Sequence, residues 1–218
     1  MNASLKTALK WWCAILTWDL AEERTWEQSE RAPVHLFVDA RGQPPRCAAV
    51  LFVDGACLYT DGEPAQQYLE QLGKREDNQM MSLEIMAVAV GLSTFSKELK
   101  GRNVVVYSDN TGAEACLIMS AQIVRICLFC LCMLQAAVRQ GRTRCWDHSV
   151  MVHEIWSHAL INQIQVWVAR VPSKYNISDD PSRESYALLR ELEAVWREPL
   201  LAKMYTVNTL DGFFSRSV

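Results

Sequence analysis

The 218-residue chain lacks an excess of basic residues, since 22 Lys and Arg stand against 25 Asp and Glu and leave a net charge of −3. Affinity for phosphate backbones comes mainly from Lys and Arg, so this balance argues against a protein that binds nucleic acid through bulk charge. A local basic surface, or an acidic site neutralised by metal ions, is compatible with it. Half of the residues are hydrophobic and 22% are charged, which indicates a folded globular chain.

A secretion signal is also lacking. The N-terminal apolar run is short and mixes Trp11, Trp12 and Trp18 with polar residues. Residues 118–138 are long enough to span a bilayer, but Arg125 near their middle would cost about 2.5 to 3.5 kcal/mol on insertion scales. We therefore expect no membrane segment, and an apolar helix at this position that is buried or faces a partner.

The cysteines do not complete a metal site of the zinc type. Four of the eight, at positions 116, 127, 130 and 132, lie in or beside the apolar stretch, without the second pair or nearby His that tetrahedral zinc needs. Reduced thiols in a protein core fit this placement better than disulfides in loops. An intracellular location, cytoplasmic or nuclear, is the expectation.

The pattern of apolar residues predicts an α/β fold. Residues 4–24 carry apolar side chains three and four positions apart, which indicates an amphipathic helix. Asp54-Gly55 is a strong signal for a two-residue hairpin between two strands. The expected strands are 34–39, 47–53, 56–60, 103–107 and 164–171, and the expected helices after the hairpin are 79–99, one following Asp109, 151–163 and a closing helix at 181–196.

Three carboxylates stand in unusual places within this pattern. Asp39 closes the apolar run 36–38, and Asp109 follows the apolar run 104–107, so each is expected where a strand ends. Glu84 lies in an otherwise apolar helical segment, where a buried carboxylate is costly without a cation or a hydrogen bond. If the two strands are neighbours joined by this helix, all three acids meet at one edge of the sheet.

Each of these acids alone has an ordinary interpretation. Asp109 is suited to cap a helix, Asp39 to start a turn, and Glu84 to point to solvent. All three together are less easily explained in this way, because their expected positions converge. Only cations would make such a cluster of carboxylates tolerable.

Three blocks of sequence resemble the RNase H domain of retroelement reverse transcriptases. They are Ser82-Leu83-Glu84-Ile85-Met86-Ala87, Tyr107-Ser108-Asp109-Asn110-Thr111, and the block from Val171 to Arg183, which is similar to the family's Asn-Ile-Ala-Asp-x-x-Ser-Arg signature. The resemblance covers about residues 34–197. It implies an RNase H-like fold with a five-stranded mixed sheet, in the order 3-2-1-4-5, flanked by helices.

The resemblance implies three segments in the chain. Residues 1–32 would be an N-terminal helical segment, similar to the connection that joins a polymerase to its RNase H domain. Residues 33–200 would be the RNase H-like domain, with a helical insertion near 118–140, and 201–218 a C-terminal tail. The chain would then be a fragment or remnant of a retroelement polyprotein, with a reverse-transcriptase polymerase domain as a candidate partner and an oligomeric state that the sequence leaves open.

The family's catalytic and metal-binding acids correspond to Asp39, Glu84, Asp109 and Asp179. Asp180 is the adjacent alternative for the fourth acid, but the alignment of Asn176, Ser182 and Arg183 favours Asp179. In the resembled enzymes two Mg²⁺ ions, with Mn²⁺ as an alternative, activate a water molecule and stabilise the leaving oxygen at phosphorus. Asp39 is expected to bridge both ions, with Glu84 and Asp109 on one and Asp179 on the other.

The implied substrate is the RNA strand of an RNA–DNA hybrid, recognised in part through its 2′-hydroxyl groups. The predicted substrate contacts are Arg41, Asn110, Lys174, Asn176 and Arg183. The His that often precedes the fourth acid in this family is lacking here, which predicts slower or differently assisted product release.

A module of the same fold without turnover, acting in nucleic-acid or protein binding, is the competing hypothesis, because a fold does not guarantee a function. A proofreading-type exonuclease is disfavoured, since such enzymes usually begin with Asp-x-Glu and this chain has Asp39-Ala40-Arg41.

Overall fold

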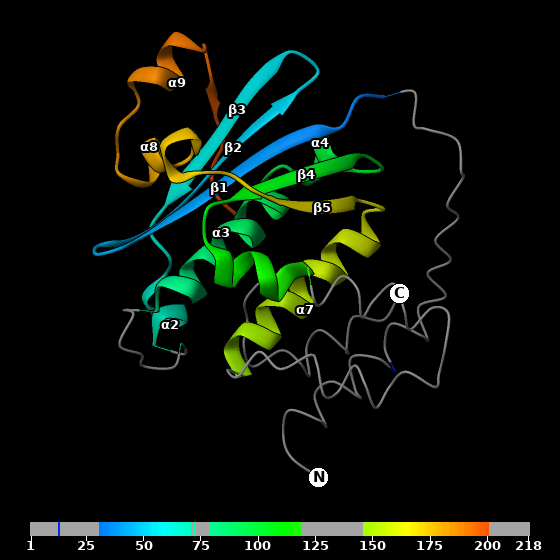
Figure 1. Ribbon diagram of the computed structural model, residues 1–218, viewed down its shortest axis with the longest axis vertical. Helices are drawn as coiled ribbons and strands as arrows, with labels where there is room; N and C mark the ends of the chain where they lie inside the picture. The colour runs from blue at the N-terminus through cyan, green and yellow to red at the C-terminus, as the bar shows by residue number, and fades with distance from the viewer. Residues whose placement is uncertain (1–12, 14–30, 71, 73–78, 119–145, 201–218) are drawn as a thin grey trace.

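One mixed sheet of six strands organises the computed structural model, which describes residues 13, 31–70, 72, 79–118 and 146–200 (Figure 1). The strands are β1 (Val34–Gly42), β2 (Pro45–Val53), β3 (Ala56–Gly62), β4 (Asn103–Ser108), β5 (Gln165–Arg170) and β6 (Val195–Trp196). Their order across the sheet is β5-β4-β1-β2-β3-β6. β2 is antiparallel to β1 and β3, whereas β4 is parallel to β1, β5 to β4 and β6 to β3.

Helices cover both faces of this sheet. In Figure 1, the long helices α3 and α7 lie on one face, and the short helices α8 and α9 lie on the other. The bounds are α2 (Gln66–Leu69), α3 (Met80–Thr94), α4 (Ser96–Leu99), α7 (Trp146–Ile161), the 3₁₀ turn η2 (Ser173–Tyr175), α8 (Asp179–Ser182) and α9 (Ala187–Glu191). A further helix begins at residue 111 and continues to 118, where the described stretch ends.

The hairpin between β2 and β3 has the predicted two-residue turn. Val53 pairs with Ala56, and the two residues between them, Asp54 and Gly55, have φ of 49° and 80°. This left-handed backbone matches the twist of the flanking strands, and Asp-Gly adopts it readily. The predicted hairpin is therefore confirmed.

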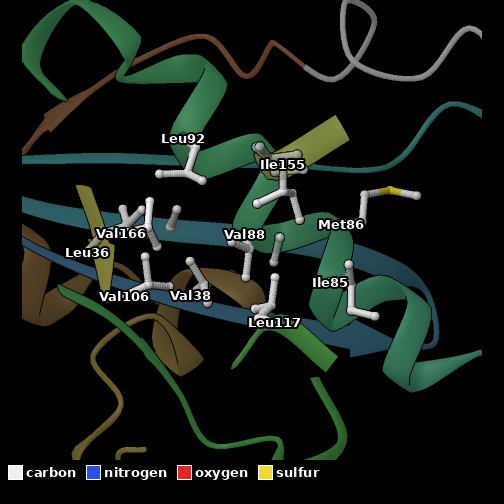
Figure 2. Packing of buried hydrophobic residues seen from close by; sticks show 14 of the residues in the cluster. Leu36, Val38, Ile85, Met86, Val88, Leu92, Val106, Leu117, Ile155 and Val166 are labelled. Atoms are coloured by element: carbon white, nitrogen blue, oxygen red, sulfur yellow. The ribbon is translucent and has the colours of Figure 1, made fainter. Parts of the chain in front are cut away.

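Helix α3 lies close against the centre of the sheet. Every residue from Ser82 to Ser93 is buried, including Glu84. A Cβ placed at Gly91 would come within 3.1 Å of Ala49 on β2 and 3.2 Å of Leu36 on β1, so glycine permits this close approach. Figure 2 shows the resulting core, with Leu36, Val38, Val106 and Val166 of the strands near Val88 and Leu92 of α3 and Ile155 of α7.

The other face of the sheet is covered over its β1–β3 half. A second apolar cluster there joins Val50 of β2 and Cys57 of β3 to Leu189 of α9, with partly buried aromatic side chains around them. Helix α8 contacts β1, β2 and β3. This contact places the start of α8, which carries Asp179, beside the strand that carries Asp39.

The predicted α/β class, the mixed sheet and its flanking helices are confirmed. The prediction of five strands in the order 3-2-1-4-5 is wrong, because β6 pairs with β3 and adds a sixth position to the sheet. The single closing helix predicted at 181–196 is also wrong. The chain forms α8, α9 and β6 instead, and it leaves the helical path where Glu184 (φ 63°) and Glu193 (φ 51°) adopt left-handed backbone.

Three predictions concern residues that lie outside those described: the helix at 4–24, the insertion near 118–140 and the tail at 201–218. Of these segments the structure describes only Cys13 and Ile118. The predicted helix at 79–99 is present as two consecutive helices, α3 and α4. No helix among the described residues is long and apolar enough to cross a membrane.

Candidate metal centre

Three predicted acids meet at one edge of the sheet. Asp39, Glu84 and Asp109 each offer a carboxylate oxygen, and these oxygens all lie within 4.8 Å of one another. Asp39 is 4% exposed and Glu84 3% exposed, while Asp109 is intermediate. The predicted convergence of these three side chains is therefore confirmed.

Strand register explains how residues so far apart in sequence meet. β1 and β4 are parallel, and Phe37 pairs with Tyr107. Two residues after this pair, Asp39 on β1 and Asp109 just beyond the end of β4 follow at the same edge of the sheet. Helix α3 connects the two strands in sequence after the hairpin, packs against β1 and β2, and carries Glu84 to this edge.

The surroundings of the cluster disfavour negative charge. The pKa of Glu84 is raised from 4.5 to about 9, mainly by burial and then by the charges of Asp39, Asp109 and Asp179, although a hydrogen bond with the Ala40 backbone opposes them. Burial likewise raises the pKa of Asp39 from 3.8 to about 7, opposed by Ser182 and Arg183. Both carboxyl groups thus bind protons unless a cation compensates their charge.

The donor set fits a hard divalent cation. Glu84 Oε2 is buried and has no hydrogen-bond partner, although burying an unpartnered polar atom is costly. None of the three acids forms an ion pair with a basic side chain in the part of the chain that the structure describes. Carboxylate oxygens are the ligands that Mg²⁺ and Mn²⁺ prefer. The arrangement can therefore hold a cation with protein oxygens at one edge of the sheet.

The fourth predicted acid lies beside the cluster but is paired. Asp179 begins α8, and its Oδ1 accepts a hydrogen bond at 2.8 Å from Arg183 Nε and forms an ion pair at 2.8 Å with Arg183 Nη2. Its negative charge contributes to the raised pKa of both Asp39 and Glu84. Asp179 is therefore near the centre, outside the group of three whose oxygens share one small volume.

Two of the predicted substrate contacts are engaged in local structure. Arg41 donates from Nη2 to Glu184 at 3.0 Å and from Nε to the Pro44 carbonyl at 3.1 Å. The side-chain oxygen Oδ1 of Asn110 accepts from the backbone N–H groups of Gly112 and Ala113, both at 3.0 Å, and so caps the helix that begins at 111.

Asn176 is placed as a positioning residue. It is 4% exposed, and its amide donates to the Val38 carbonyl at 3.0 Å and accepts from the Ser178 hydroxyl at 2.6 Å. These bonds tie the loop before Asp179 to β1 one residue before Asp39. The geometry gives no support to the predicted contact between Asn176 and substrate.

Lys174 and Arg183 are both exposed to solvent, although Arg183 is paired with Asp179. Lys174 is exposed and lies 4.6 Å from the centre of the Tyr175 ring, which is itself 64% exposed. The Arg183 side chain is 67% exposed. Both cations flank the loop and turn that carry Asp179.

Ser182 was not predicted as a functional residue. It is 1% exposed, its hydroxyl donates to the Asp179 carbonyl at 2.9 Å, and it lies close enough to Asp39 to lower the pKa of that carboxyl. The only signal for it in the sequence is its place in the Ser-Arg pair of the third block.

No family model matches the chain, and no curated protein matches it in sequence.

Proposed function

We propose that the chain carries an RNase H-like domain that hydrolyses the RNA strand of an RNA–DNA hybrid with divalent metal ions. The observation that carries this proposal is the cluster of Asp39, Glu84 and Asp109, which brings three carboxylates together and leaves a buried oxygen of Glu84 without a partner. The mixed sheet with flanking helices is compatible with such a fold. The resemblance of three sequence blocks supports the same conclusion.

Two Mg²⁺ ions, with Mn²⁺ as an alternative, are the proposed cofactor. Asp39, Glu84 and Asp109 would hold one ion, and Asp39 and Asp179 the other. When bound, the ions would supply Lewis acidity and lower the pKa of a water molecule. The raised pKa values of Asp39 and Glu84 support this assignment, because a nearby cation would offset the burial and the mutual repulsion that raise them.

The remaining residues of the edge suit a polyanionic substrate. Lys174 and Arg183 carry exposed positive charge beside the acids, where they would contact phosphate groups. Asn176 and Ser182 are buried and hold the Asp179 segment against β1. We propose that the first pair binds the substrate backbone and that the second pair fixes the fourth acid beside the first three.

A polymerase domain of a reverse transcriptase is the proposed protein partner, on the resemblance of the N-terminal segment alone. Cys13, Cys47 and Cys57 are free thiols. Free thiols support the proposal of an intracellular location.

The test is cleavage of a labelled RNA–DNA hybrid in Mg²⁺. We predict that Asp109→Asn lowers the cleavage rate by about a hundredfold or more, because it removes a charged ligand from the site. Asp54→Asn is the matched control, since Asp54 lies in the hairpin turn and pairs with Arg102. Equal rates for the native chain and Asp109→Asn would refute the proposed site, provided that Asp54→Asn also cleaves normally.

A catalytically idle module that binds nucleic acid or protein is the second candidate. The net charge of −3 and the pairing of Asp179 with Arg183 favour it. Binding of the hybrid by the native chain without cleavage in Mg²⁺ or Mn²⁺ would support the module over the enzyme.

A further inference from the structure

Among the described residues, Arg183 is the basic side chain that forms an ion pair with one of the four predicted acids, Asp179. Its Nε donates to Oδ1 of Asp179 at 2.8 Å, and its Nη2 lies 2.8 Å from the same oxygen in an ion pair. The charges of Asp39 and Asp109 also act on it, after the stronger effect of Asp179. A single guanidinium is therefore under the influence of three carboxylates, one on β1, one just after β4 and one on α8.

The backbone of this turn is fixed, whereas the end of the arginine is not. The Ser182 hydroxyl donates to the Asp179 carbonyl, and the Arg183 backbone N–H donates to the same carbonyl at 3.2 Å. The side chain of Arg183 is 67% exposed and that of Asp179 is 33% exposed. An ion pair this exposed contributes little net stability, so the guanidinium can leave Asp179 without disturbing the fold.

We propose that Arg183 is a positioning residue that occupies Asp179 while the site lacks its second divalent ion and releases Asp179 when that ion binds. This inference rests on the proposed function. A guanidinium has donors only, so the Oδ1 atom that accepts its Nε–H and pairs with its Nη2 is not free to ligate a cation. Once displaced, the guanidinium lies beside the acids, where it faces the phosphate of a bound strand.

The pair of Arg46 with Asp61 differs from the pair of Arg183 with Asp179 in being buried. Arg46 donates to Asp61 Oδ2 from Nε at 3.0 Å and from Nη2 at 2.6 Å, and Asp61 is 6% exposed. Such a buried pair is costly to break, unlike the pair of Asp179 and Arg183. The exposed pair is thus suited to exchange with a cation from solution.

The experiment is calorimetric titration of the full chain with Mn²⁺, without nucleic acid. We expect Arg183→Gln to bind the second ion about 3- to 10-fold more tightly than the native chain, because a competing positive charge is gone. Arg183→Lys should fall between them, since lysine keeps the positive charge without the hydrogen bond that Nε donates. Arg41→Gln is the matched control and should bind as the native chain does, because Arg41 pairs with Glu184.

The same variants should differ in the opposite direction in hybrid cleavage. At saturating Mn²⁺, Arg183→Gln should cleave more slowly than the native chain although it binds the ion more tightly. A residue with only a structural role would weaken both properties together. Unchanged or weaker binding by Arg183→Gln and Arg183→Lys, while the native chain binds Mn²⁺, would overturn the inference and leave the proposed function standing. No Mn²⁺ binding by the native chain would overturn both.

Discussion

Two buried aspartates of the sheet, Asp61 on β3 and Asp39 on β1, are almost equally hidden from solvent, at 6% and 4% exposure. Asp61 accepts two hydrogen bonds from Arg46 and one from the Tyr186 hydroxyl at 2.8 Å. Asp39 faces acids instead, and its pKa is raised to about 7, mainly by burial and then by the charges of Asp109 and Asp179.

The difference separates a carboxylate that holds the fold from one that is available to a ligand. Asp61 is paired with the cation Arg46 from the same chain. Its hydrogen bond from Tyr186 also holds the segment between α8 and α9 against β3. Asp39 shares its edge with Glu84, whose Oε2 has no partner. The sheet therefore has one acidic site that is complete within the chain and another that a cation from solution would complete.

The largest effect should come from breaking the complete site. We predict that Asp61→Asn lowers the free energy of unfolding by about 2 to 4 kcal/mol, because it leaves Arg46 and Tyr186 without their shared charged acceptor. Urea denaturation of the full chain measures this change. Asp54→Asn is the control and should cost less than Asp61→Asn, since Asp54 is 70% exposed in its pair with Arg102. Equal losses for the two variants would contradict the comparison.

A smaller effect should follow from changing pH at the incomplete site. The folded protein without metal holds protons on Asp39 and Glu84 more tightly than the unfolded chain does, because their pKa values are raised to about 7 and about 9. The stability that these protons provide is fully present below about pH 4 and is lost as pH rises through 7 and 9. We predict that the melting temperature in EDTA falls between pH 5 and 9 and that Mg²⁺ reduces this fall.

The matched variant sharpens that prediction. Glu84→Gln removes the carboxyl group with the higher of the two raised pKa values. The melting temperature of this variant in EDTA should therefore depend less on pH than that of the native chain. At pH 9 it should be the more stable of the two, because the native chain has by then lost the stability that the proton on Glu84 provides. A native melting temperature that rises from pH 5 to 9 in EDTA would contradict the assigned environment of these acids.

The parts of the fold that depend on local pattern were predictable. The hairpin follows from Asp54-Gly55, and β1 and β4 follow from apolar runs that each end in an acid. The closing segment was not predictable in the same way. Glu184 and Glu193 adopt a left-handed backbone, which is unusual for glutamate, so nothing in their identity marks the ends of α8 and α9. Arg41 binds Glu184, and Tyr186 binds Asp61, across 143 and 125 positions of sequence.

The candidate site was predicted in its three central acids because their unusual positions are visible in the sequence. Glu84 stands in an apolar helix, and Asp39 and Asp109 end apolar strands. Asn176 was interpreted as a substrate contact, but its amide is bonded to Val38, 138 positions away. Burial of this kind depends on tertiary packing, and the residue type alone carries no sign of it. The contacts of Ser182 also depend on tertiary packing, so its role was not predictable from the sequence.

The most direct test of the central claim is crystallography of the full chain with Mn²⁺, using anomalous scattering to locate the ion. The account predicts an anomalous peak bounded by Asp39, Glu84 and Asp109, and loss of that peak in Glu84→Gln crystals grown in the same way. A well-ordered site in which these three side chains keep their positions and no peak lies between them, at saturating Mn²⁺, would contradict it.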